Sequence, residues 1–171
     1  MMIVDLITLG DSTLEFDFSV APEEIDLSAE YAQLKNAAEV KGNVTRHIAH
    51  TDVEGVITAE IELECSRCLD KIDKNFEIPF KAAFVVPENY TQAKEAELGA
   101  EDLDVSVIEG NEIDLTELVR EQILLSLPEQ VFCSEDCKGL CDKCGANRNL
   151  INCNCKENEV DPRWAALKNL K

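Results

Sequence analysis

Residues 56–65, V-I-T-A-E-I-E-L-E-C, alternate between two kinds of side chain. The odd-numbered positions are apolar throughout, and after Val56 the even-numbered positions are threonine or glutamate. A period of two places successive side chains on opposite faces of a strand, so this run predicts a half-buried β-strand. Glu60, Glu62 and Glu64 would then form its solvated face. The neighbouring segments of the chain are expected to form further strands of the same sheet.

Shorter alternating runs on both sides predict further strands. Within residues 1–20, the apolar Leu14, Phe16 and Phe18 alternate with polar residues. Apolar runs recur through 38–86 and predict a succession of strands, one of which contains both Val44 and Ile48. Turns are predicted at 52–55 and 70–73. Close spacing with short turns favours antiparallel pairing in a meander, either a curled sheet or a small barrel-like body.

A helix is predicted over 114–126. Apolar residues recur there at helical spacing, Asp114 is the expected N-cap, Glu117 occupies the capping-box position, and Pro128 follows the end. The acidic, poorly patterned residues 87–110 are predicted to form a long surface loop. Asp161 before Pro162 predicts a short C-terminal helix. The predicted fold class is therefore α+β.

The 171 residues carry 35 acidic and 16 basic side chains, a net charge of −19. Residues 1–132 hold 29 acidic and 9 basic side chains, whereas residues 133–171 hold 6 and 7. Two regions are therefore expected: an acidic β-rich body over 1–132 and a cysteine-rich tail over 133–171. The body would repel a phosphate backbone; its acidity either serves solubility alone or attracts a basic partner. No apolar run could span a bilayer and no secretory signal is evident, so a cytoplasmic protein is predicted.

The cysteines predict a metal-binding tail. In a reducing compartment, cysteines at C-x-x-C and C-x-C spacing are typical zinc ligands, because two such pairs complete a tetrahedron. The first predicted zinc site takes its four ligands from the tail: Cys141, Cys144, Cys153 and Cys155. Gly145, directly after the second ligand, can adopt the positive φ that a tight metal-binding turn requires.

The remaining four cysteines leave alternatives open. They could form a second zinc site that fastens the tail to the body, or the ligands could be exchanged between the two sites; these cysteines are Cys65, Cys68, Cys133 and Cys137. The competing hypothesis is a thiol redox or metal-relay protein that uses Cys65 and Cys68, with Arg67 favouring a thiolate. No helix is predicted to begin at this C-x-x-C, which disfavours redox catalysis.

Other catalytic constellations are absent from the sequence. His47 and His50 are the only histidines; on a predicted strand they would point to opposite faces and could not share a metal without a bulge. No phosphate-binding glycine loop and no aromatic nucleic-acid platform are present. The sequence therefore indicates neither an enzyme nor a small-molecule substrate.

The basic residues of the tail suggest where RNA could be contacted. Lys143 and Arg148 would be fixed by zinc on a rigid knuckle, ready to meet phosphates. Alternatively, these charges only balance the negative charge of a zinc ion with four thiolate ligands.

Several motifs in combination resemble the bacterial YceD family. They are E-C-S-R-C-L (64–69), E-I-D-L-T-E-L-V-R-E-Q-I-L-L-S-L-P (112–128), C-S-E-D-C-K-G-L-C-D-K-C-G-A-N-R-N (133–149), C-N-C (153–155) and D-P-R (161–163). The resemblance implies a non-enzymatic cytoplasmic protein associated with accumulation of large-subunit ribosomal RNA, whose gene usually lies beside that of a small basic large-subunit ribosomal protein. A pre-ribosomal particle or such a basic protein is the implied partner.

Overall fold

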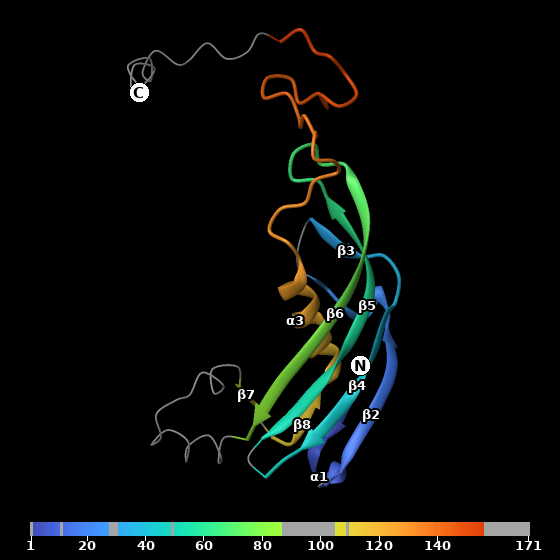
Figure 1. Cartoon of the computed structure of the whole chain (residues 1–171), viewed down its shortest axis with the longest axis vertical. Helices are drawn as coiled ribbons and strands as arrows, with labels where there is room; N and C mark the ends of the chain where they lie inside the picture. Colours follow the sequence, from blue (N-terminus) through green and yellow to red (C-terminus); the bar gives the residue numbers. More distant parts are fainter. Residues whose placement is uncertain are drawn as a thin grey trace, which may run out of the picture.

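The structure is a computed structural model that describes residues 2–10, 12–27, 31–48, 50–86, 105–108 and 110–155. Most of the predicted acidic loop and the predicted C-terminal helix lie outside these residues. The described part is a curved β-sheet with one helix against it and a cysteine-rich segment at one end (Figure 1).

The main sheet has six strands. Five of them lie in the order β2-β4-β5-β6-β7, and the sixth, β3, pairs with the C-terminal part of β5. All of its pairs are antiparallel except β6 with β7, so the sheet is mixed, and β2 and β7 are its edges. The strands and helices are β1 (Ile3–Asp5), α1 (Leu6–Leu9), β2 (Thr13–Val20), η1 (Pro22–Glu24), β3 (Ala32–Leu34), β4 (Ala38–Arg46), β5 (Thr51–Glu64), β6 (Lys71–Val85), β7 (Val105–Val107), β8 (Glu112–Asp114) and α3 (Leu115–Ser126). Strand β7 lies where a loop was predicted.

The hairpin of β5 and β6 dominates the sheet. The two strands pair without interruption from Thr51 with Phe84 to Glu64 with Lys71. The turn predicted at 52–55 is wrong, because these residues lie inside β5; the turn predicted at 70–73 is also displaced, because β6 begins at Lys71. The hairpin tip, residues 65–70, thus stands at the end of two long strands.

Two glycines explain the misplaced turn. Gly42 on β4 and Gly55 on β5 face each other in register, and a Cβ added at Gly55 would lie 2.4 Å from the carbonyl oxygen of Lys41. Phe16 and Phe80 flank this pair on β2 and β6, and both are buried. Gly55 is therefore a close-approach position within a strand, although Asp-Val-Glu-Gly has the composition of a turn.

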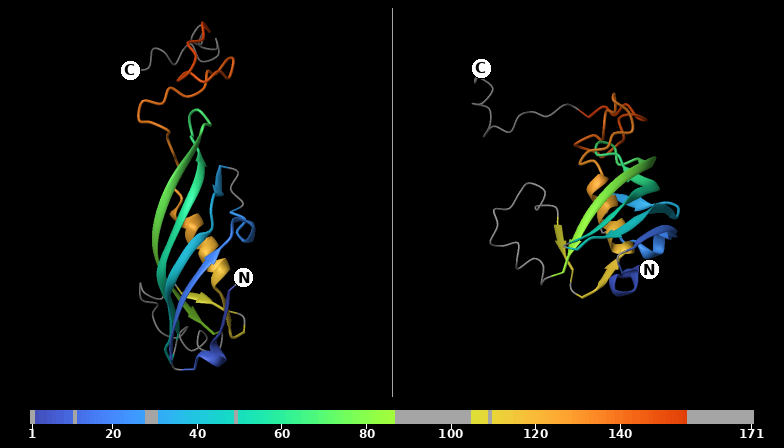
Figure 2. Two further views of the ribbon diagram at one scale, coloured as in Figure 1. Left: turned by 90° about the vertical axis from the view of Figure 1, so that its right-hand side faces the viewer. Right: turned by 60° about the horizontal axis from the view of Figure 1, so that its bottom comes forward.

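Helix α3 packs against the inner face of the sheet (Figure 2). Val119 and Ile123 on the helix and Ile57 and Ile61 on β5 are almost fully buried. Asp114 caps the helix as predicted, since its side chain accepts hydrogen bonds from the backbone N–H groups of the next turn. Glu117 does not complete the predicted capping box in this way; its carboxylate accepts hydrogen bonds from Arg120. Among the described helices, none is long and apolar enough to cross a membrane.

Candidate metal centres

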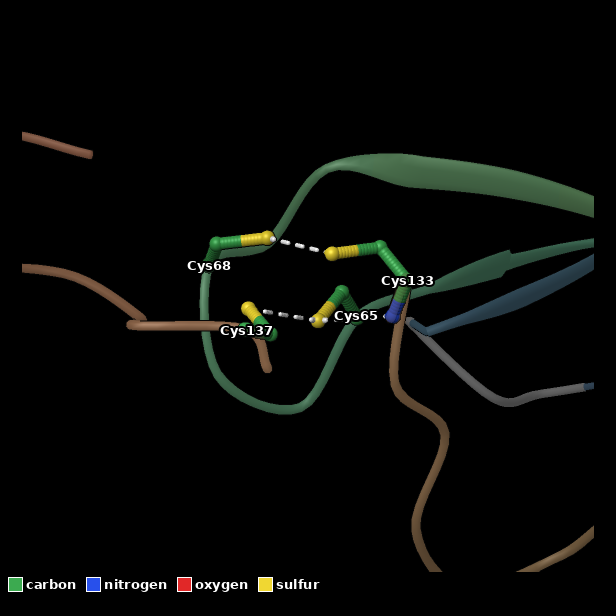
Figure 3. A group of neighbouring side chains, drawn as sticks. All are labelled: Cys65, Cys68, Cys133 and Cys137. Atoms are coloured by element: carbon green, nitrogen blue, oxygen red, sulfur yellow. Dashed lines mark hydrogen bonds between the residues drawn. The ribbon is translucent and has the colours of Figure 1, made fainter. Parts of the chain in front are cut away.

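The structure brings the eight cysteines into the two groups named above. One consists of Cys65, Cys68, Cys133 and Cys137, and the other of Cys141, Cys144, Cys153 and Cys155. Within each group all four sulfur atoms lie within 4.8 Å of one another. The first group joins residues from the β5–β6 hairpin tip to residues beyond α3 (Figure 3). The second is formed within residues 141–155.

Distances in the first group suit a tetrahedral ion. The Sγ atoms of Cys65 and Cys137 are 3.8 Å apart, and those of Cys68 and Cys133 are 3.6 Å apart. With zinc–sulfur bonds of about 2.3 Å, the edge of a tetrahedron of thiolates is about 3.8 Å. Cys65, Cys68 and Cys137 are buried. A zinc ion would therefore fit among these sulfurs with little movement of the chain.

Backbone hydrogen bonds hold the distant segments together at the hairpin tip. The N–H of Ser66 donates to the carbonyl of Val131 at 2.7 Å, and the N–H of Val131 donates to the Ser66 hydroxyl at 3.0 Å. Arg67 was expected to favour a thiolate, but its guanidinium donates to the carbonyl of Cys137 and lies over the ring of Phe132. Arg67 therefore holds the 131–140 segment against the hairpin tip.

The two C-x-x-C motifs adopt the same local geometry. The carbonyl of Cys65 accepts a hydrogen bond from the N–H of Leu69, and that of Cys141 accepts one from Gly145. Both residues after the second cysteine are left-handed, with φ of 62° at Leu69 and 70° at Gly145. The positive φ expected at Gly145 is confirmed, and Leu69 adopts the same conformation despite its side chain.

The pKa values of the thiols follow from this geometry. Burial raises the pKa of Cys65, but the N–H groups of Cys68, Arg67 and Cys133 outweigh it and lower that pKa to about 6. The N–H groups of Cys144 and Lys143 similarly lower the pKa of Cys141 to about 6. The side chains of Cys144 and Cys141 raise the pKa of Cys155 to about 12. Each group therefore holds a thiol that ionises readily beside a thiol with a raised pKa, Cys68 in the first group and Cys155 in the second. A dication bound among the sulfurs would favour the thiolate form of all four.

The two predicted RNA-contacting residues lie in different surroundings. Arg148 directs its guanidinium to the sulfur of Cys141 at 3.9 Å, and the Cys141 side chain raises the pKa of Arg148. Lys143 is exposed. The position of Arg148 is the one expected if its charge balances thiolates.

Polar side chains that the sequence analysis did not single out connect the two groups. Asn149 donates to the sulfur of Cys137 at 3.3 Å and lowers its pKa, and Asn147 donates to the carboxylate of Asp70 at 2.9 Å. Asp70 also lies 3.3 Å from the sulfur of Cys68. No pattern in the sequence indicates these partners of Asn147 and Asn149.

Comparison with known proteins identifies a family whose model covers most of the chain. Residues 53–171 match the family described as "Large ribosomal RNA subunit accumulation protein YceD", and the match includes all eight cysteines. The chain belongs to the YceD family. The family description refers to accumulation of large ribosomal RNA, which supports a role in ribosome biogenesis at the level of the family.

Named relatives extend over the N-terminal part. The chain is 33% identical over 169 residues to YlbN of Bacillus subtilis, covering 98% of this YceD-family chain and 94% of YlbN. It is 29% identical to a chloroplastic YCED homolog 1 of Arabidopsis thaliana, covering 78% of this chain and 48% of that protein. A Mycobacterium tuberculosis protein is 30% identical over 67% of this chain and 53% of its own length. No solved structure matches the chain.

Proposed function

We propose that this chain is a non-enzymatic cytoplasmic factor in the accumulation of large-subunit ribosomal RNA that binds a basic ribosomal protein on the outer face of its sheet. The observation that carries the proposal is the charge of that face. The family assignment supports the ribosomal context. In this proposal both cysteine groups bind zinc, and the first group holds the segment beyond α3 against the hairpin tip.

The outer face consists of the side chains that alternate with the buried ones along β2, β4, β5 and β6. It carries ten carboxylates, those of Glu15, Asp17, Glu39, Asp52, Glu54, Glu60, Glu62, Glu64, Asp73 and Glu77.

Four lysines offset only part of this charge. Lys41 pairs with Asp17 at 3.2 Å, Lys81 with Asp52 at 3.6 Å, Lys71 with Glu62, and Lys35 with both Glu60 and Asp73. All five pairs are at the surface, so each contributes little to stability. A net negative field over a broad sheet face accelerates association with a basic partner and makes it sensitive to salt.

Charge reversal tests the partner surface. Glu39 and Glu77 flank Thr58 in one row across β4, β5 and β6, in the middle of the outer face. We expect Glu39→Lys with Glu77→Lys to weaken binding of the small basic ribosomal protein encoded beside family genes by about tenfold at low salt. The measurement is a binding titration at two salt concentrations.

The matched control reverses two carboxylates outside this face. Glu121 on α3 and Glu129 beyond it are exposed, and changing both to lysine alters the net charge by the same amount. Equal weakening by the two double variants would show that only total charge matters and would contradict the outer face as the binding surface. Tight binding of the chain to protein-free ribosomal RNA at physiological salt would likewise oppose the proposal.

Zinc content is tested on protein purified without added metal. Elemental analysis should find about two zinc ions per chain, and Cys144→Ser should remove about one of them while Ser134→Ala removes none. Recovery of metal-free protein with eight titratable thiols would refute the zinc sites.

The redox or metal-relay alternative for Cys65 and Cys68 finds less support. Both thiols are buried, and each has a sulfur of another segment beside it, Cys137 and Cys133 respectively. A C-x-x-C that exchanges electrons needs an accessible thiolate.

A further inference from the structure

The two histidines lie at the end of the sheet remote from the cysteines, in the turn between β4 and β5. The N–H of His47 donates to the carbonyl of His50 at 2.8 Å, which closes the turn, and the two rings are 4.7 Å apart. The prediction that these residues share a strand and point to opposite faces is wrong, because β4 ends at Arg46; Ile48, assigned to the same strand, is fully exposed.

Both imidazoles point toward one carboxylate. The Nε2 atom of His47 is 3.6 Å from one oxygen of Asp52, and the Nε2 atom of His50 is 3.5 Å from the other. The three ligand atoms that a cation would use lie within 4.8 Å of one another. With zinc–nitrogen and zinc–oxygen bonds of about 2.0–2.1 Å, ligand atoms of a tetrahedral ion are about 3.3 Å apart.

We propose that His47, His50 and Asp52 form a third metal site, for a divalent cation of the zinc type. Two imidazoles and one carboxylate favour this class of ion over calcium or magnesium, which prefer oxygen ligands. Three protein ligands leave a tetrahedral position open to water or to a side chain of a bound partner, unlike the two groups of four cysteines.

The site is independent of the cysteine groups. Asp52 is near the start of β5 and Cys65 directly follows its end, so at about 3.3 Å per residue they are roughly 40 Å apart. The turn lies at the lower end of the sheet in Figure 1 and the hairpin tip at the upper end. Pairing of Arg46 with Thr51 and of Thr45 with Asp52 fixes the base of the turn.

Neighbouring cations leave room for an ion. Lys81 is 3.6 Å from Asp52, but its side chain is 66% exposed and can turn to solvent. Arg46 donates to the carbonyl of Leu6, which holds its charge at that carbonyl. Glu54, two residues along β5, adds negative charge to the same face. Lys81 is therefore the internal competitor for Asp52.

The test uses the full chain with two equivalents of Zn²⁺ to load the cysteine groups, which is then titrated with further Zn²⁺. Because the chain has only two histidines, their imidazole signals in NMR report on this site whether or not the cysteines hold zinc. We expect both Nε2 signals to shift together on binding of one further equivalent. His47→Gln, His50→Gln and Asp52→Asn should each weaken this binding at least about tenfold, while Lys81→Gln should strengthen it a few-fold.

Glu54→Gln is the matched control, because it removes the same charge from the same face without removing a ligand. It should change the affinity less than about twofold. Equal effects of Asp52→Asn and Glu54→Gln would overturn the site, as would unshifted imidazole signals at excess Zn²⁺. Amide NMR spectra identify any variant that misfolds. The ligand variants that still fold then decide whether the third site exists. If the cysteine groups hold zinc but the histidines do not bind it, only the third site is overturned. If the histidines bind zinc but the cysteine groups hold none, only the zinc sites proposed above are overturned.

Discussion

Leu69 and Gly145 occupy equivalent positions in two metal-binding turns, and they show how one backbone requirement is met by different residues. Each follows the second cysteine of a C-x-x-C motif, donates its N–H to the carbonyl of the first cysteine, and has φ near 65°. A side chain in this conformation costs about 1–2 kcal/mol, which glycine avoids. Leu69 is also largely exposed, so packing compensates little of that cost.

Exchanging the residue types at these two positions should have opposite effects. Gly145→Ala should weaken zinc binding at the second group by about fivefold, because an added Cβ meets no atom within 4 Å and only backbone strain opposes it. Leu69→Gly should stabilise the hairpin tip by about 0.5 kcal/mol after the greater chain entropy of glycine is subtracted. Competition with a chelator and urea unfolding measure the two effects. A tighter zinc site in Gly145→Ala would contradict the shared geometry.

Arg148 and Lys143 provide a second comparison at single residues. Arg148→Ala should weaken zinc binding at the second group several-fold, because the guanidinium lies 3.9 Å from the thiolate of Cys141. Lys143→Ala, which removes the same charge from an exposed position of the same segment, should leave the affinity nearly unchanged. The measurement is zinc competition at fixed ionic strength. Equal losses in both variants would indicate a general effect of charge rather than the contact with Cys141.

At the scale of elements, the alternation of residues 56–65 was sufficient to predict β5, and the capping residue and apolar spacing were sufficient to predict α3. The turns could not be predicted in the same way. Gly55 has the composition of a turn but serves close approach to Gly42, and the real β4–β5 turn at His47 and His50 carries no glycine or proline. Cysteine spacing predicted the group within 141–155, whereas the combination of the other four cysteines depends on the contact between the hairpin tip and the segment after α3, which spacing does not indicate.

The role of Gly55 gives a prediction for the sheet. Gly55→Ala should destabilise the protein by about 2–3 kcal/mol, because the new Cβ would lie 2.4 Å from the backbone oxygen of Lys41 and the two strands would have to separate. Thr58→Ala, at an exposed position of the same strand, should cost less than about 1 kcal/mol. Urea unfolding followed by circular dichroism measures both. A Gly55→Ala variant as stable as Thr58→Ala would show that the close approach is not required.

At the scale of the whole molecule, two kinds of stabilisation are spatially separated. The apolar core lies between α3 and the middle of the sheet, where Ile57, Val119 and Ile123 are buried. Val131, beyond α3, joins this apolar core, and after it the described contacts of the segment are at the hairpin tip, with Arg67, Asp70 and the cysteines. Its order should therefore depend on metal far more than the order of the sheet does.

Zinc removal should unfold one end of the molecule and spare the other. Structural zinc contributes on the order of 10 kcal/mol to a folded thiolate site, whereas the core residues on β5 and α3 bury their side chains without it. After chelation, amides of 131–155 should exchange with solvent at nearly unprotected rates while those in the middle of β5 remain protected. Cys141→Ser should expose only the second group and leave the hydrogen bonds between Val131 and Ser66 intact, which separates the contributions of the two ions. Hydrogen exchange read by mass spectrometry measures the protection of the amides in each segment. Equal loss of protection in β5 and in 131–155 would mean that the sheet and the cysteine-rich segment fold as one cooperative unit.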